Sequence, residues 1–190
     1  MLKTLIRSTA FASLIAVSAA GMSTGAVAQD MPMVGGVAMD PAKTIVENAS
    51  AAPNLSTLVA AVTAAGLAET LSGEGPFTVF APTNAAFEKL PDGTVEELLK
   101  PENKAQLTKI LTYHVVPAAA TSEAAMKMIE DDGGEHPAPT VAGETISLSM
   151  EGDSIIVTDA QGNKATVEQA DVMQSNGVVH VIDTVLMPAD

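Results

Sequence analysis

The sequence predicts an α+β fold with a mainly antiparallel sheet. Helical patterns dominate the first part of the chain, where apolar residues recur at helical spacing between Leu55 and Ala65. Beyond Pro139 the pattern changes to apolar–polar alternation, as in residues 145–150. One buried strand, residues 77–81, interrupts the helical part. Helices first, a meander last and one inserted strand are typical of α+β domains.

Residues 1–28 have the composition of a cleavable signal peptide. Lys3 and Arg7 give a positive start, residues 10–20 form an apolar run, and residues 26–28 are a small-x-small cleavage motif. We expect cleavage near Ala28/Gln29 and a secreted or periplasmic protein. The apolar run is too short to span a bilayer and no second run follows, so no transmembrane segment is expected.

The rest of the chain is strongly acidic and has no cysteine. Without residues 1–28 it keeps seven lysines and no arginine against 23 acidic residues, a formal net charge of −16. Electrostatic repulsion therefore disfavours nucleic acid and anionic membranes as partners. The chain that remains is long enough for one domain with its own core, unsupported by disulfides.

The first elements of that domain follow from prolines and glycines. Residues 29–40 are rich in Met, Gly and Val without periodicity, which predicts a flexible N-terminal arm before a domain at 41–188. Asp40 and Pro41 are typical of the cap and first position of a helix, which ends before Pro53. The next helix carries the Leu55–Ala65 stripe and ends at a glycine.

The most informative segment, 77–87, predicts a strand that stops at a proline and restarts as a helix. Alternate residues of the strand point to opposite faces. Proline cannot continue a ladder, and Thr and Asn are good helix N-caps. The residues that we expect to hold this corner are Phe77, Phe80, Pro82, Thr83, Asn84 and Phe87.

Three further helices are expected before residue 130. A capping-box pattern opens the first at Thr94, and a proline begins the second at Pro101. Thr121 or Ser122 caps the third, which ends near Ile129. The second of these helices buries Leu107, Ile110 and Leu111.

Four β segments are expected after residue 139. Apolar residues alternate with Thr and Ser at 145–150, and a turn at 151–154 leads into the apolar run 155–157. Turns at 161–163 and 176–177 separate two more segments.

Three segments together resemble the conserved boxes of the fasciclin family: FTVFAPTNAAF at 77–87, LTYHVVP at 111–117 and NGVVHVIDTVLMP at 176–188. Their order and spacing also fit. The resemblance implies a compact wedge of β-strands flanked by helices, and a secreted or surface adhesion module without a catalytic site. It also implies that Tyr113 and His114 are linked to cell binding. Residues 130–139 look longer and more acidic than the common form of the family.

Two histidines are expected to be mainly structural. Helical spacing places His114 on the buried face of its helix, and strand periodicity places His180 on one face with Val178 and Ile182. A buried histidine of this kind is usually satisfied by backbone groups. That interpretation is compatible with binding if Tyr113 and His114 shape the surface from beneath.

No metal or cofactor is expected. His136 lies in a polar, acidic loop at 130–139, but the alternating acids that calcium requires are absent. Three separated histidines lack the spacing of a zinc site. The methionines of the N-terminal arm offer soft ligands for Cu(I), yet an arm docked on the domain is the stronger interpretation.

The leading hypothesis is an exported, non-enzymatic and monomeric adhesion module that binds a cell-surface or matrix protein or glycan. The alternative is a periplasmic carrier of a small apolar ligand between wedge and helices, which a Met- and Ala-rich composition suits. A hydrolase has only a G-x-S-x-G match at 21–25 in its favour, inside the predicted signal peptide and outside the required strand–helix context.

Overall fold

A computed structural model describes residues 31–91 and 93–189, so the predicted signal peptide lies outside the described residues. The helices are α1 (Ile45–Ala51), η1 (Pro53–Leu55), α2 (Ser56–Ala65), α3 (Ala68–Leu71), α4 (Asn84–Glu88), α5 (Thr94–Leu98), η2 (Pro101–Asn103), α6 (Lys104–Tyr113) and α7 (Ser122–Asp131), of which η1 and η2 are 3₁₀ turns. The strands are β1 (Met33–Val34), β2 (Val37–Ala38), β3 (Phe77–Pro82), β4 (Val115–Val116), β5 (Glu135–Pro139), β6 (Thr145–Glu151), β7 (Ser154–Thr158), β8 (Lys164–Gln174) and β9 (Gly177–Ile182).

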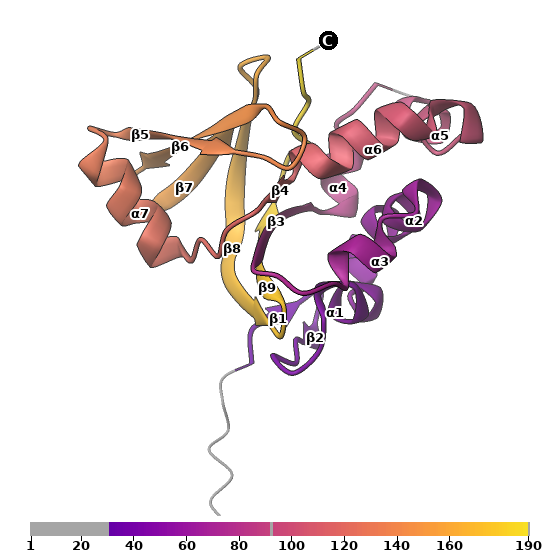
Figure 1. The fold of residues 1–190 in the computed structure, drawn as a ribbon, viewed down its shortest axis with the longest axis horizontal. Helices are drawn as coiled ribbons and strands as arrows, with labels where there is room; N and C mark the ends of the chain where they lie inside the picture. The colour runs from indigo at the N-terminus through magenta and orange to yellow at the C-terminus, as the bar shows by residue number, and fades with distance from the viewer. Residues whose placement is uncertain (1–30, 92, 190) are drawn as a thin grey trace, which may run out of the picture.

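The main sheet confirms the predicted α+β class. Its strand order is β4-β3-β9-β8-β7-β6-β5, and every pairing except β3–β9 is antiparallel. Helices α1 to α6 gather on one side of β3 and β9, and α7 lies on the other side beside β5 and β6 (Figure 1). The sheet is therefore the spine of a wedge with helices on both flanks.

The parallel pair β3–β9 is the centre of the fold. It runs in register from Phe77 opposite Gly177 to Pro82 opposite Ile182. The two backbones come so close at its start that a Cβ on Gly177 would lie 2.0 Å from the carbonyl oxygen of Phe77. Only glycine fits there without moving one of the strands.

Strand alternation divides the core into two clusters. Val79 and Ala81 of β3 face the helices and pack with α1, α2 and α6. Phe80, between them in the sequence, points into the opposite cluster, inside the curled sheet, with Leu148 and Ile182. The alternation predicted for residues 77–81 is therefore observed, and each face of one strand supports a different half of the core.

The curled sheet does not close into a barrel. Its two edge strands, β4 and β5, belong to opposite ends of the strand order, and the chain after β5 meets β4 where the N–H of Val141 donates to the carbonyl of Val115 at 2.8 Å. Strand β4 ends before Pro117, and β5 contains Pro137 and Pro139. Because proline has no N–H to donate, continuous pairing along this seam is prevented.

The N-terminal region differs from the predicted flexible arm. Residues 33–38 form the β1–β2 hairpin, and the side chains of Val34 and Met39 are only 2% and 1% exposed. Both pack into the cluster between helices and sheet, so burial of apolar surface outweighs the conformational entropy of the glycine turn. Residues 29–30 lie outside the described residues.

One predicted helix start and one predicted capping box are wrong. Helix α1 begins at Ile45 rather than after Asp40, because Thr44 accepts from the N–H of Glu47 and the Glu47 side chain returns to the Thr44 backbone. Helix α5 has Gly93 at its N-cap, with φ of 86°, so Thr94 is helical and forms no capping box. The cap of α1 thus lies four residues beyond Asp40, and no side chain caps α5.

The acidic segment 130–139 is not a loop. Helix α7 continues through Asp131, and residues 135–139 form β5, which pairs with β6 from Glu135 opposite Ser149 to Pro139 opposite Thr145. Its prolines and charged residues are atypical of a strand, so the sequence pattern did not predict β5. Edge strands tolerate both, because one of their sides makes no ladder bonds.

Candidate functional site

Tyr113 and His114 close helix α6 and are both buried. The Tyr113 side chain is 0% exposed; its hydroxyl donates to the carbonyl of Thr145 at 3.1 Å and accepts from the N–H of Ala160 at 2.9 Å. Burial raises the pKa of this hydroxyl. Tyr113 therefore links α6 to the β5–β6 and β7–β8 turns, with no polar group left for a partner.

His114 is equally committed to the protein interior. Its Nδ1 lies 2.8 Å from the carbonyl of Ile110, and its Nε2 accepts from the N–H of Leu186 at 2.9 Å. This arrangement requires a neutral ring with its proton on Nδ1. Burial lowers the pKa of His114 to about 4, which is consistent with the neutral form.

Asp159 fastens the same C-terminal segment from the other side. Its Oδ2 accepts from the N–H of Met187 at 2.9 Å, and its Oδ1 accepts from the N–H groups of Gln161 and Asn163 at 2.9 and 2.8 Å. His114 and Asp159 thus hold consecutive residues of the segment after β9. The bond from His114 to Leu186 fixes the end of α6 against this segment, and the bonds of Tyr113 fix it against the β5–β6 and β7–β8 turns.

His180 holds the segment before α7. Its Nε2 lies 2.7 Å from the carbonyl of Ala120, and its Nδ1 accepts from the N–H of Asp171 at 3.3 Å. Its ring stacks on Phe80 with centroids 5.6 Å apart. Burial lowers the pKa of His180 as well.

A Ser–Asp–His group at this point does not form a catalytic arrangement. The hydroxyl of Ser122 donates to the carboxylate of Asp171, and both nitrogens of His180 bond backbone groups instead of that hydroxyl. Nucleophilic catalysis needs a base in contact with the nucleophile. Ser122 and Asp171 instead fix the first turn of α7.

The corner after β3 serves two helices. Thr83 caps its own helix, α4, as predicted, through the N–H of Ala86. Asn84 instead caps α2: its Oδ1 accepts from the N–H of Thr57 at 3.1 Å, and its Nδ2 donates to the carbonyl of Pro53 at 3.0 Å. Of the other corner residues, Phe80, Pro82 and Phe87 are buried and Phe77 is partly buried.

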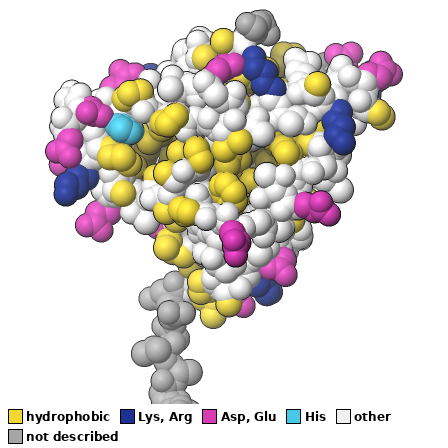
Figure 2. Space-filling model, in the orientation of Figure 1, with side chains coloured by type: hydrophobic (Ala, Val, Ile, Leu, Met, Phe, Trp, Pro, Cys, Tyr) yellow, Lys and Arg dark blue, Asp and Glu magenta, His cyan; other side chains and the backbone are white. Residues whose placement is uncertain are grey.

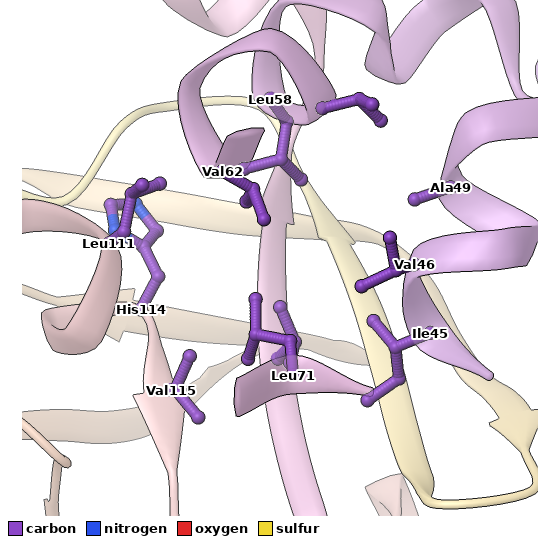
Figure 3. A pocket seen from close by; sticks show the side chains of 11 residues that line it. Ile45, Val46, Ala49, Leu58, Val62, Leu71, Leu111, His114 and Val115 are labelled. Atoms are coloured by element: carbon purple, nitrogen blue, oxygen red, sulfur yellow. The ribbon is translucent and has the colours of Figure 1, made fainter. Parts of the chain in front are cut away.

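An apolar hollow lies above His114, between α6 and helices α1 to α3. Figure 3 shows Leu111 and His114 facing Leu58 and Val62 across it. Its cavity volume is about 30 Å³, room for about one water-sized sphere. We call this hollow the helical groove; its lining is Ile45, Val46, Ala49, Leu58, Val59, Val62, Leu71, Val79, Leu111, His114 and Val115.

A second hollow lies at the open seam of the sheet, and we call it the seam pocket. It has a volume of about 110 Å³ and an almost entirely apolar lining. Apolar side chains gather across this face of the molecule, whereas acidic side chains lie mostly at its periphery (Figure 2). The lining residues are Thr78, Phe80, Val116, Pro117, Ala118, Ala120, Met128, His136, Ala138, Pro139 and Leu148.

The described residues contain no group of three or more His, Asp or Glu side chains placed to hold a metal ion. Of the methionines near the N-terminus, Met39 is buried while Met31 and Met33 are exposed. Across residues 31–91 and 93–189, no helix combines the length and apolar character needed to cross a bilayer.

Sequence reasoning missed several residues of this architecture. The run from Asp159 to Asn163 has the spacing of an Asx turn, a signal that points to the role of Asp159. Asp171 has φ of 56° and lies in an irregular stretch of β8, for which no sequence signal was evident. The partners of Asn84, Thr57 and Pro53, are 27 and 31 residues away, beyond the reach of local patterns.

Most of this chain matches known proteins, in sequence and in fold. The model of the Fasciclin domain family matches residues 53–188. The chain is 49% identical over 192 residues to Protein sll1483 of Synechocystis sp., covering 98% of this chain and 99% of that protein. It is 41% identical over 165 residues to Immunogenic protein MPB70 of Mycobacterium bovis, covering 82% and 72% of the two chains.

A solved structure shares the fold at lower identity. The domain pair from the insect cell adhesion molecule Fasciclin I superposes with a TM-score of 0.70 and 21% identity, covering 80% of this chain. The match spans about half, 52%, of that solved chain. The family model, these relatives and the shared fold place the chain in the fasciclin family.

Proposed function

We propose that this protein is an exported, non-enzymatic interaction module that binds a protein of a cell surface or extracellular matrix through its helical groove. The observation that carries the proposal is the apolar lining of the helical groove, which helices α1, α2, α3 and α6 share. Val46, Ala49 and Val59 line it and are only partly buried. Partly exposed apolar side chains that cluster on neighbouring helices are typical of protein contact sites.

The Tyr113–His114 pair supports binding from below the surface. Neither side chain is free to touch a partner, since their polar atoms already bond Thr145, Ala160 and Leu186. His114 and Leu111 nevertheless form one wall of the groove. Replacing either member of the pair would shift α6 and alter the groove indirectly.

The kind of partner follows from chemistry and from a relative. The likeness to an insect cell adhesion molecule favours a surface or matrix partner. The net charge of −16 expected after removal of residues 1–28 disfavours anionic partners and self-association through charged faces. The predicted signal peptide supports export and its cleavage near Gln29.

The carrier alternative is less well supported. Sites for small ligands usually enclose about 300–1,000 Å³. The apolar hollows here measure about 30 and 110 Å³, so a carrier would have to open before loading. A small apolar groove bordered by partly exposed side chains suits contact with a protein surface better than it suits an enclosed ligand.

Purification from the native source tests the proposal. We expect an N-terminus near Gln29, no stoichiometric ligand by mass spectrometry, and retention of the pure protein on the cell envelope or matrix of its source. A ligand present at one equivalent, or a protein that stays in the cytoplasm, would overturn the proposal. Retention that persists at high salt would show that apolar contacts, and not exposed charges, carry the binding.

A further inference from the structure

The seam pocket lies where the two edge strands of the sheet, β4 and β5, do not pair with each other. Pro117 follows β4 on one side of the opening, and Pro137 and Pro139 lie in β5 on the other. The missing N–H groups prevent a ladder between these edges, and the Val141–Val115 bond joins them at one end only. The rest of this edge is left without a backbone ladder, and the pocket lies there.

The interior of the pocket is lined by apolar side chains and by one hydroxyl that is already hydrogen-bonded. Phe80 and Leu148 belong to the buried cluster behind it, and Ala118 and Ala138 leave space where larger side chains would fill it. The pocket contains one buried hydroxyl, that of Thr78. It donates to the carbonyl of Ala118 at 2.5 Å and accepts from the N–H of Ala120 at 2.8 Å, so it needs no further partner. Only an apolar group can therefore enter without losing hydrogen bonds.

The volume of the seam pocket is large enough for one apolar side chain. An engineered apolar cavity of about 150 Å³ binds benzene, and the seam pocket measures about 110 Å³. Met128 of α7 borders the pocket, and a flexible thioether adapts to occupants of slightly different shape.

The rim of the pocket is acidic. His136 lines it and is bonded through Nδ1 to Asp132 at 2.5 Å. Asp132 and the preceding Asp131 are both exposed at the end of α7. An apolar group flanked by cations complements this combination of an apolar interior and a negative border.

We propose that the seam pocket is an anchor site for a partner protein, which inserts one aliphatic or aromatic side chain flanked by lysine or arginine. This inference rests on the proposed role as an interaction module but assigns a second surface, across β4 from the helical groove. Burial of the anchor supplies the affinity, whereas the acidic rim selects the flanking residues and speeds encounter.

Short peptides test the anchor directly. The probes are the pentapeptides Lys-Lys-Leu-Lys-Lys, Lys-Lys-Ala-Lys-Lys and Glu-Glu-Leu-Glu-Glu, titrated into the protein by NMR. We expect the first to bind at least about tenfold more tightly than either of the others. The shifted signals should be the Met128 methyl and the Ala118 and Ala138 amides.

Variants separate the interior of the pocket from its rim. Ala138→Leu fills the pocket and should abolish binding of the leucine peptide. Ala118→Leu serves the same purpose if that variant fails to fold, because Ala118 lines the pocket and is exposed. Asp131→Asn with Asp132→Asn should weaken binding several-fold at low salt, while the matched pair Glu96→Gln with Glu97→Gln on α5 should not.

Two results would overturn the anchor. One is equal affinity for the leucine and alanine peptides; the other is a set of shifted signals in the helical groove around Val59. Failure here and failure of the proposed function are distinguishable. A protein that binds its envelope partner normally with Ala138→Leu retains the groove function and lacks the anchor.

Discussion

The Nε2 atom of His114 accepts a hydrogen bond from the backbone N–H of Leu186 at 2.9 Å, although 72 residues separate them in the chain. The bond joins the end of α6 to the segment after β9. Because both partners are buried, removing the imidazole leaves the N–H of Leu186 without a hydrogen-bond partner in the protein. The Tyr113–His114 motif therefore joins α6 by hydrogen bonds to segments that are distant in the sequence.

We predict that His114→Ala lowers the free energy of unfolding by about 1–3 kcal/mol for the orphaned N–H, with a further loss from the cavity left behind. Urea titration monitored by circular dichroism measures this change. Gln106→Ala, an exposed site on the same helix, is the control and should change stability by less than about 0.5 kcal/mol. A fully stable His114→Ala variant that no longer binds its partner would show the structural interpretation to be wrong.

Stability should depend on pH through the buried histidines. Burial lowers the pKa of folded His114 from an ordinary 6.5 to about 4 and lowers that of His180 in the same direction. The unfolded chain therefore binds the proton first, so this stabilisation is complete above about pH 6.5 and is lost as the pH falls toward 4. For His114 the total loss is about 3 kcal/mol.

The measurement is the free energy of unfolding at several pH values between 7 and 4. Comparing the wild type with His114→Gln isolates one histidine, since relief of acidic repulsion affects both proteins alike. We expect the two curves to converge as the pH falls. Curves that stay parallel would mean that His114 keeps its ordinary pKa when folded.

Asn84 gives a prediction about helix capping at a distance. Asn84→Ala removes the acceptor for Thr57 and the donor to Pro53, and we expect a loss of about 1–2 kcal/mol. Asn84→Asp keeps the acceptor and adds a negative charge at the start of α2, so it should recover part of the loss. Thermal unfolding of both variants checks the order, and equal losses would contradict the capping role.

Gly177 tests the close approach of β3 and β9. A Cβ at this position would lie 2.0 Å from the Phe77 carbonyl oxygen, so Gly177→Ala must separate the central strands. We expect a loss of more than about 2 kcal/mol or failure to fold. Ser175→Ala, an exposed change two residues away, should be nearly neutral in the same denaturation experiment.

Local patterns predicted much of this fold, for physical reasons that particular residues illustrate. Alternation along residues 77–81 predicted which side chains enter each cluster, because strand geometry has a fixed period. Thr83, named together with Asn84, and Thr121, named as an alternative to Ser122, were predicted as caps, because a cap is a local interaction. The helix stripe ending at Gly66 was correct for the same reason.

The errors arose where tertiary contacts decided the outcome. Residues 33–38 form a hairpin because Val34 and Met39 find a core to enter, which composition alone does not show. Strand β5 contains two prolines and is stable because β6 pairs with one of its sides. The seam pocket brings together residues from 78 to 148, so no local signal marks it.

The most direct measurement concerns Val59, which lines the helical groove, and Ala60, its exposed neighbour on α2. Val59→Lys and Ala60→Lys add the same charge to the same helix, and only the first places it in the groove. Retention of each variant on the cell envelope of the source organism should fall at least about tenfold for Val59→Lys, a change of about 1.4 kcal/mol, and should be unchanged for Ala60→Lys. Equal retention of both folded variants would contradict binding through the helical groove.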